Sequence, residues 1–356
     1  MERPGFDPHI SAAKGFCIIA VVTFHSVPPQ FLQNILEFLP LSIFLLISGM
    51  FLKDDHLLHP GRFVIGRFRR LWVPYALFMF ICLFGHNMLA NIHLYSDHYT
   101  TEQIRQRVFS VLTMQERDNM LGCFWFLKEL LYATLLSFVA IKLSQFLLGD
   151  AYHPAVMLPV ALLVLIVATN FYSIPYLAQI TTLYPKTLLA TAIYLCGYVF
   201  AHTRWRSLSN WVTVAVLVAL SCWASWGYDD NFNTTWWNLP RFFFTTMIIS
   251  FAVIYFCQML RGKALSALSY IGRYTMPILI LQFFAFRLVD VLKIAVYDIP
   301  VGRLADFPII ADNNQYFWII YTIVGLALPI MAANVYERAK CGIKQRFAPI
   351  SKNVTL

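Results

Sequence analysis

The chain has 356 residues, of which 59 % are hydrophobic and only 13 % are charged. Soluble domains carry about a quarter charged residues, and a soluble chain of this length cannot bury so much apolar surface. Several apolar runs are about 20 residues long, the length that a helix needs to cross a bilayer. The net charge of +9 is not arranged as a basic stripe with interleaved aromatic residues, so we expect membrane lipids and no nucleic acid as partners.

Ten apolar stretches predict transmembrane helices, and the composition therefore predicts an all-α, polytopic membrane protein. With the N-terminus inside, most of the 27 Lys and Arg residues fall in inner segments, which the positive-inside rule requires. We expect both termini in the cytoplasm and one domain over residues 1–356, with no appended soluble domain. The expected spans are 10–28, 35–52, 72–89, 124–148, 154–170, 187–203, 210–227, 241–260, 270–288 and 316–336.

Two outer segments, 90–123 and 289–315, are long, and long loops in compact proteins tend to be functional. The first is either a surface for a polar acceptor or an amphipathic helix lying on the membrane.

The seven cysteines form no CxxC pair. We therefore expect thiols buried as small hydrophobic groups, no disulfide framework and no metal site.

Two ionisable residues lie in the first expected span, Lys14 and His25. Eleven residues separate them, so at about 100° per residue their side chains differ by about 20° around a helix and by about 16 Å along it. A polar stripe of this kind needs a cavity or partners. The alternative is that Lys14 extends to the inner headgroups and His25 lies at the outer interface.

Five short motifs follow one another along the chain. They are SAAKGFCIIAVVTFHS with Lys14 and His25, LSIFLLISGMFL with Ser48 and Gly49, FVIGRFRRLWVPYALF, CFWFLKELL, and LSYIGRYTMPILILQFF. Together they resemble the membrane-bound acyltransferase-3 family, which O-acylates cell-surface carbohydrates. The resemblance covers about residues 7 to 290. Two positions depart from the family pattern: Lys14 stands where Arg is commoner, and Gln282 stands where a His is frequent.

The resemblance implies transfer of an acyl group from cytosolic acyl-CoA, with acetyl-CoA the first choice, to a hydroxyl of an extracytoplasmic glycan or glycolipid. Such a transfer needs a general base, and His25 is the candidate because imidazole titrates near neutral pH. Arg67, Arg69 and Arg70 fall in the expected cytosolic loop between the second and third spans, and they are candidate contacts to the phosphates of coenzyme A. Lys14 is a catalytic candidate together with His25, and we also expect it to bind the donor at the entrance of the donor passage. The same arginines also fit an ordinary positive-inside cluster.

Ser48 and Trp125 are candidate donors to the oxyanion and, with Glu129, candidate contacts to the acceptor. Lys128 and Glu129 fit an interfacial ion pair equally well. We expect no metal cofactor and a bacterial inner-membrane location.

The main rival interpretation is a transporter or flippase of a lipid-linked sugar or small metabolite, and another is a sensory or structural subunit. The sequence leaves open the acyl group, since succinyl transfer occurs in relatives. It also leaves open the acceptor, the choice between direct transfer and an acyl-enzyme, and the oligomeric state.

Overall fold

The computed structural model describes residues 7–37, 40–171, 184–203, 210–225 and 238–346, and every regular element in these ranges is helical. The elements are α1 (Pro8–His25), α2 (Gln30–Glu37), α3 (Pro40–Met50), α4 (Asp54–Leu58), α5 (Pro60–Asn91), α6 (Thr101–Leu112), α7 (Trp125–Leu148), η1 (Gly149–Ala151), η2 (Pro154–Val156), α8 (Met157–Thr169), α10 (Pro185–Ala201), α11 (Trp211–Ser225), α12 (Asn238–Met259), α13 (Gly262–Arg273), α14 (Thr275–Tyr297), η5 (Val301–Ala305) and α15 (Phe317–Arg346).

The prediction of an all-α polytopic membrane protein is confirmed. Among the described residues, six helical segments are long and apolar enough to cross a membrane: Pro8–His25, Gln30–Met50, Pro60–Asn91, Trp125–Ala151, Asn238–Met259 and Phe317–Cys341. The other expected spans correspond to the shorter apolar helices α8, α10 and α11 and to α14. The two ends of the chain, which we expect in the cytoplasm, lie outside the described ranges.

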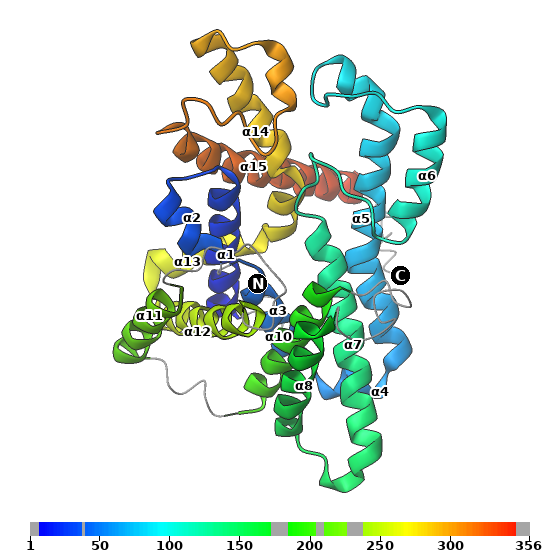
Figure 1. Ribbon diagram of the computed structural model, residues 1–356, viewed down its shortest axis with the longest axis vertical. Helices are drawn as coiled ribbons and strands as arrows, with labels where there is room; N and C mark the ends of the chain where they lie inside the picture. The colour runs from blue at the N-terminus through cyan, green and yellow to red at the C-terminus, as the bar shows by residue number, and fades with distance from the viewer. Residues whose placement is uncertain (1–6, 38–39, 172–183, 204–209, 226–237, 347–356) are drawn as a thin grey trace, which may run out of the picture.

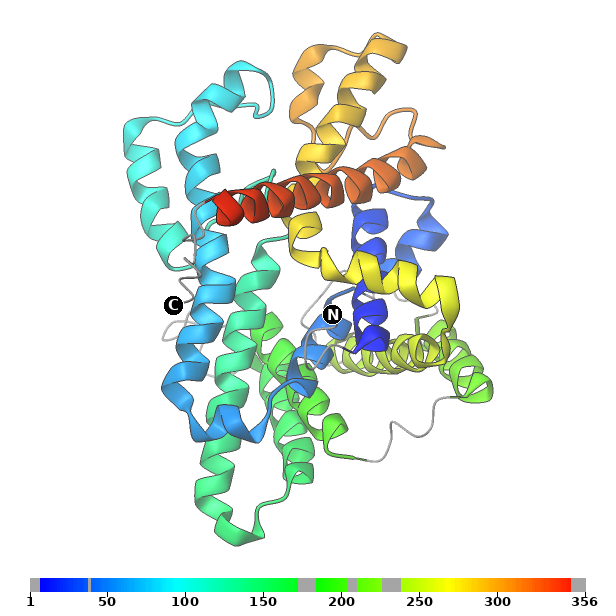
Figure 2. The same ribbon diagram turned by 180° about the vertical axis from the view of Figure 1, so that it is seen from behind.

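Helix α1 lies in the centre of the helical array and contacts α3, α12, α13, α14 and α15 (Figure 1). On one side, α3, α7 and α8 pack around α10, and α5 packs along α7. Helices α12 and α15 run across the direction of α1, α5 and α7, as both views show (Figure 2). The central helix that carries Lys14 and His25 is therefore enclosed by other helices over most of its length.

Helix α1 is held against α13 by direct backbone approach. A Cβ atom on Gly15 would lie 2.0 Å from the carbonyl oxygen of Leu268, and one on Gly272 would lie 1.9 Å from that of Ser11. The hydroxyl of Ser11 also donates to the carbonyl of Ser269 at 3.0 Å. Small residues allow membrane helices to approach this closely. The contact fixes the N-terminal half of α1, where Lys14 lies.

Two expected spans have wrong bounds. The span 270–288 crosses a break at Tyr274, where α13 ends and α14 begins. The span 72–89 begins too late, because α5 starts at Pro60 and takes in the basic run. A window of mean hydropathy cannot detect a break inside an apolar run, nor a helix that continues into charged residues.

Helix α14 continues to Tyr297 because its buried charges are paired inside the protein. The guanidinium of Arg287 donates to Asp290 at 2.7 Å and to the carbonyls of Leu304 and Asp306 at 2.9 and 2.7 Å. Asp290 also accepts from the hydroxyl of Tyr321 at 2.6 Å. A buried ion pair is tolerated when further hydrogen bonds satisfy its members. This network holds segment 298–316 against α14.

Candidate active site

A basic cavity of about 740 Å³ opens at the junction of α1, α3, α4 and α5. Lys14 of α1 and Ser48 of α3 both line it, and the ammonium of Lys14 lies 5.2 Å from the centre of the Phe51 ring. The structure thus places Ser48 beside Lys14 and not beside His25. The full lining is Lys14, Ile47, Ser48, Phe51, Lys53, Asp55, His56, His59, Arg62, Phe63, Gly66, Arg67 and Arg70.

The charge of this cavity is strongly positive. Among its lining residues, the basic side chains face one carboxylate, that of Asp55. Burial, followed by the nearby charge of Arg67, lowers the pKa of His56, so that ring is neutral at pH 7. The positive charge therefore comes from the five side chains of Lys14, Lys53, Arg62, Arg67 and Arg70. Guanidinium groups bind phosphate through paired donors, and the cavity is suited to a polyphosphate ligand.

Helical geometry separates Arg69 from the other two predicted phosphate contacts. Arg67 and Arg70 line the cavity and Arg69 does not. All three lie on α5 rather than on a loop. At about 100° per residue, Arg70 is about 60° from Arg67 around the helix, whereas Arg69 is about 160° from it on the shorter side. Arg67 is further fixed by the Phe63 ring, whose centre lies 5.0 Å from its guanidinium carbon.

His25 ends α1 at the opposite end from Lys14, and its ring faces other protein groups. Its Nδ1 lies 2.8 Å from the carbonyl oxygen of Val21, and its ring meets that of Phe283 edge to face at 5.1 Å. The ring is partly accessible. The segment that follows α14 covers this end of the helix, since Asn314 donates to the carbonyls of Ser26 and Val27 at 3.0 and 2.8 Å.

Two polar groups that we did not predict as site residues lie beside His25. The Sγ atom of Cys123 is 3.8 Å from Nε2 of His25. The side-chain amide of Gln282 donates to that sulfur at 2.7 Å. Both residues are in motifs quoted above, and Gln282 was visible as a polar residue inside an apolar run. Cys123 was interpreted as a buried hydrophobic group because nothing in the sequence places it beside His25.

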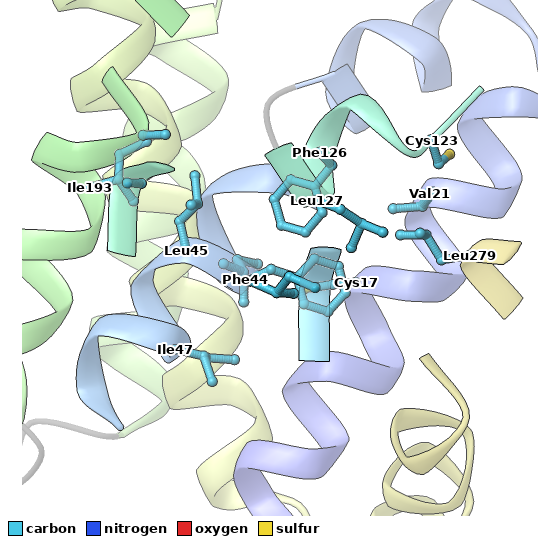
Figure 3. Packing of buried hydrophobic residues seen from close by; sticks show 14 of the residues in the cluster. Cys17, Val21, Phe44, Leu45, Ile47, Cys123, Phe126, Leu127, Ile193 and Leu279 are labelled. Atoms are coloured by element: carbon cyan, nitrogen blue, oxygen red, sulfur yellow. The ribbon is translucent and has the colours of Figure 1, made fainter. Parts of the chain in front are cut away.

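Packed apolar side chains fill the space along α1 between the basic cavity and His25. Cys17 and Ile18 of α1 are fully buried, and Val21 is 8 % exposed. Figure 3 shows Cys17 and Val21 on the side of α1 that meets Phe44 of α3 and Leu127 of α7, with Cys123 at the upper end of this packing. A donor that reaches from the cavity to His25 has to displace these side chains.

A second, smaller pocket lies at the other end of α3 and contains Trp125 and Glu129. The carboxylate of Glu129 accepts from the hydroxyl of Thr187 at 2.5 Å, and the ammonium of Lys186 lies 5.5 Å from the centre of the Trp125 ring. The pocket is lined by Glu37, Ser42, Leu45, Trp125, Phe126, Glu129, Lys186, Leu189, Ala190, Ile193, Phe242 and Thr246.

Lys128 lies on α7, the helix that also carries Trp125 and Glu129, and its side chain lies over an aromatic ring. Its ammonium is 4.8 Å from the centre of the Tyr184 ring and 5.8 Å from that of Tyr132. Glu129 instead points into the pocket with Trp125. A Trp ring beside a carboxylate and an ammonium offers an apolar face and hydrogen-bonding groups to a polar ligand.

The geometry therefore comprises a basic cavity with Lys14, a buried polar cluster with His25, and a pocket with Trp125 and Glu129. A family model described as an acyltransferase domain, acyltransferase family 3, matches residues 7–336, nearly the whole chain. No curated protein and no solved structure matches the chain significantly.

Proposed function

Because this chain belongs to the acyltransferase-3 family, we propose that it transfers an acyl group, acetyl first of all, from acyl-CoA to a hydroxyl of a glycan or glycolipid. The family and the apolar helices make it a membrane acyltransferase. The finer assignment is supported by one observation above all: a single buried helix carries Lys14 into a basic cavity and His25 into a polar cluster at its other end.

In this proposal the nucleotide of acyl-CoA binds in the basic cavity from the cytosol. Its phosphates contact Arg67 and Arg70, and Lys14 neutralises charge at the entrance. The flexible arm of the donor follows α1 over about 16 Å and displaces the apolar side chains that fill this space. His25 then takes the proton of the attacking hydroxyl as the acyl carbonyl is attacked. The acceptor binds in the pocket of Trp125 and Glu129 at the outer face of a bacterial inner membrane.

The direct experiment is transfer of a labelled acyl group. Purified protein in detergent or vesicles is incubated with labelled acetyl-CoA and candidate glycans or glycolipids, and label in the acceptor is measured. Thermal stabilisation by coenzyme A is measured in parallel, because a ligand that binds the folded state raises its stability. A sugar transporter would show neither. Absence of both, with folded protein, would refute the proposed function.

Replacing Arg67 or Arg70 by Ala is expected to weaken the donor interaction. Each substitution removes a charge-assisted hydrogen bond to the donor, which weakens donor binding by about 1.5–3 kcal/mol. The KM for acetyl-CoA is therefore expected to rise at least about tenfold. The turnover at saturating donor should change little, because neither residue lies at the reacting atoms. The measurement is KM and kcat at varied acetyl-CoA concentration.

Arg69→Ala is the matched control for these two variants. It removes the same charge from the same helix, but Arg69 does not line the cavity. Its KM for acetyl-CoA should stay within about twofold of wild type. Equal effects of all three substitutions would show that only the overall positive charge of α5 matters, and would contradict specific phosphate contacts.

Replacing Glu129 by Gln is expected to raise the KM for the acceptor while leaving the KM for acetyl-CoA unchanged. The carboxylate is buried and accepts a hydrogen bond from the hydroxyl of Thr187. The amide of the substituted Gln has the same size, but hydrogen bonds to its oxygen are weaker by about 1–2 kcal/mol because it carries no charge. Glu102→Gln changes an exposed carboxylate on α6 and serves as the control. An unchanged acceptor KM in Glu129→Gln would remove this pocket from the proposal.

A further inference from the structure

Three polar side chains meet in apolar surroundings at the outer end of α1. His25 is partly buried, Cys123 is 5 % exposed and Gln282 is fully buried. They come from three separate parts of the chain: the end of α1, the residues before α7, and α14. The ring of Phe283 packs edge to face against His25 and that of Phe307 packs against Phe283. Polar groups in such a place cost free energy unless they are paired or await a ligand.

The hydrogen bond to Val21 decides which nitrogen of His25 can act as a base. A backbone carbonyl only accepts, so Nδ1, at 2.8 Å from it, carries the proton. In the neutral ring the free lone pair is then on Nε2. The Cys123 sulfur lies 3.8 Å from Nε2 and 3.9 Å from Nδ1, and of these two nitrogens Nε2 is the one that can accept its proton. A thiol beside an imidazole lone pair, with the imidazole oriented by a third group, is the arrangement of an activated nucleophile.

Gln282 is incompletely satisfied at this site. Its amide nitrogen donates to the sulfur of Cys123 at 2.7 Å, and its Oε1 is buried without a hydrogen-bond partner among the described residues. Sulfur is a weak acceptor, so the buried amide N–H of Gln282 gains little free energy by donating to Cys123. A carbonyl oxygen that becomes negatively charged near this sulfur would be a stronger partner.

We propose that Cys123 is the nucleophile of an acyl-enzyme and carries the acyl group as a thioester between donor and acceptor. The inference rests on the proposed function and specifies its route. The sulfur of Cys123 attacks the carbonyl carbon of acyl-CoA while Nε2 of His25 takes the thiol proton. The new carbon–sulfur bond forms, the bond to the coenzyme A sulfur breaks, and His25 returns the proton to that leaving thiolate. The Gln282 amide donates to the carbonyl oxygen as charge develops on it.

The second step repeats the first with the acceptor. Its hydroxyl attacks the Cys123 thioester, His25 takes the hydroxyl proton and gives it to the departing Cys123 sulfur. The products are the O-acyl acceptor and the free thiol. Burial raises the pKa of the Cys123 thiol to about 12, so the resting group is protonated. The attack is therefore coupled to proton transfer to His25, whose place beside the sulfur becomes essential.

The test uses the full-length protein and needs no acceptor. A two-step route predicts exchange of the acyl group between acetyl-CoA and labelled free coenzyme A in the absence of any glycan. It also predicts at most one acyl group per chain after acid quench, located on the peptide that contains Cys123 and released by neutral hydroxylamine. Transfer between two thiols is nearly neutral in free energy, so excess acetyl-CoA should load a readily detected fraction of the protein.

Three variants sharpen the test. In Cys123→Ala and Cys123→Ser, the rate of coenzyme A exchange should fall to the low level expected of His25→Ala. Thermal stabilisation of both variants by coenzyme A should persist. Cys257→Ala removes a fully buried thiol of α12 and should keep wild-type exchange and loading. Stabilisation of each variant by coenzyme A shows that it is folded and binds the donor.

The outcomes separate this inference from the proposed function. Transfer to acceptor by wild type, with no exchange and no loading at Cys123, would overturn the acyl-enzyme and leave a direct transferase. Full activity of Cys123→Ala would overturn it in the same way. A third outcome would also overturn it: Cys123→Ala loses activity, but no acylated Cys123 is found in wild type. The thiol would then only help to position other groups and would not carry the acyl group. Failure of wild type to bind coenzyme A would overturn both.

Discussion

His25→Ala is expected to abolish acyl transfer while leaving a folded protein in the membrane. A positioned general base contributes about 10²–10⁴-fold to rate, so the turnover of this variant should fall by at least about 10²-fold. The expected loss follows from the proposed role of His25: Nδ1 is bound to the carbonyl of Val21, which leaves Nε2 free to act as the base. The measurement is label transfer from acetyl-CoA together with thermal stabilisation by coenzyme A.

His9→Ala is a close control for this variant. His9 lies at the other end of the same helix, and its Nδ1 also lies 2.8 Å from a backbone carbonyl, that of Cys257. The two substitutions thus remove the same kind of ring and the same kind of hydrogen bond. Stabilisation by coenzyme A should persist in His25→Ala, since the basic cavity that we propose for the donor is at Lys14. Undiminished transfer by His25→Ala would remove the imidazole from the mechanism.

The spacing of Lys14 and His25 was informative because it is a local property of one helix. Eleven residues place both on one face, and α1 is a continuous helix from Pro8 to His25. The same local reasoning explains Arg67 and Arg70, once α5 is known to begin at Pro60. The sequence alone suggested a loop for these residues, because charges lower mean hydropathy and hide the start of the helix.

The neighbours of His25 could not be predicted, since they depend on contacts between distant parts of the chain. Cys123 and Gln282 lie 98 and 159 residues from their partners in this cluster, His25 and Cys123 respectively. No spacing rule links the residues before α7 to Gln282 of α14. The continuation of α14 past Arg287 escaped prediction for the same reason, because its pairing carbonyls come from segment 298–316.

Gly49 belongs to one of the motifs on which the family resemblance rests, and the structure supplies a physical reason for a glycine there. A Cβ atom at Gly49 would lie 2.0 Å from the carbonyl oxygen of Tyr194, and one at Gly197 would lie 2.1 Å from that of Leu46. Helices α3 and α10 therefore approach each other backbone to backbone. A carbonyl in a helix cannot swing aside as a flexible side chain can, so any side chain at Gly49 forces the two helices apart.

Gly49→Ala is accordingly expected to destabilise the protein by more than about 3 kcal/mol, the upper part of the range for overpacked cores. The added methyl separates α3 from α10. This separation displaces Ser48 at the basic cavity and distorts the pocket lined by Leu189 and Ala190. The measurements are yield of monodisperse protein in detergent and the midpoint of thermal unfolding. Gly85→Ala on α5 is the control, because its Cβ would meet nothing closer than 3.9 Å. That change should stabilise the helix by up to about 1 kcal/mol. A thermal midpoint of Gly49→Ala equal to that of Gly85→Ala would show that α3 and α10 do not make this close contact.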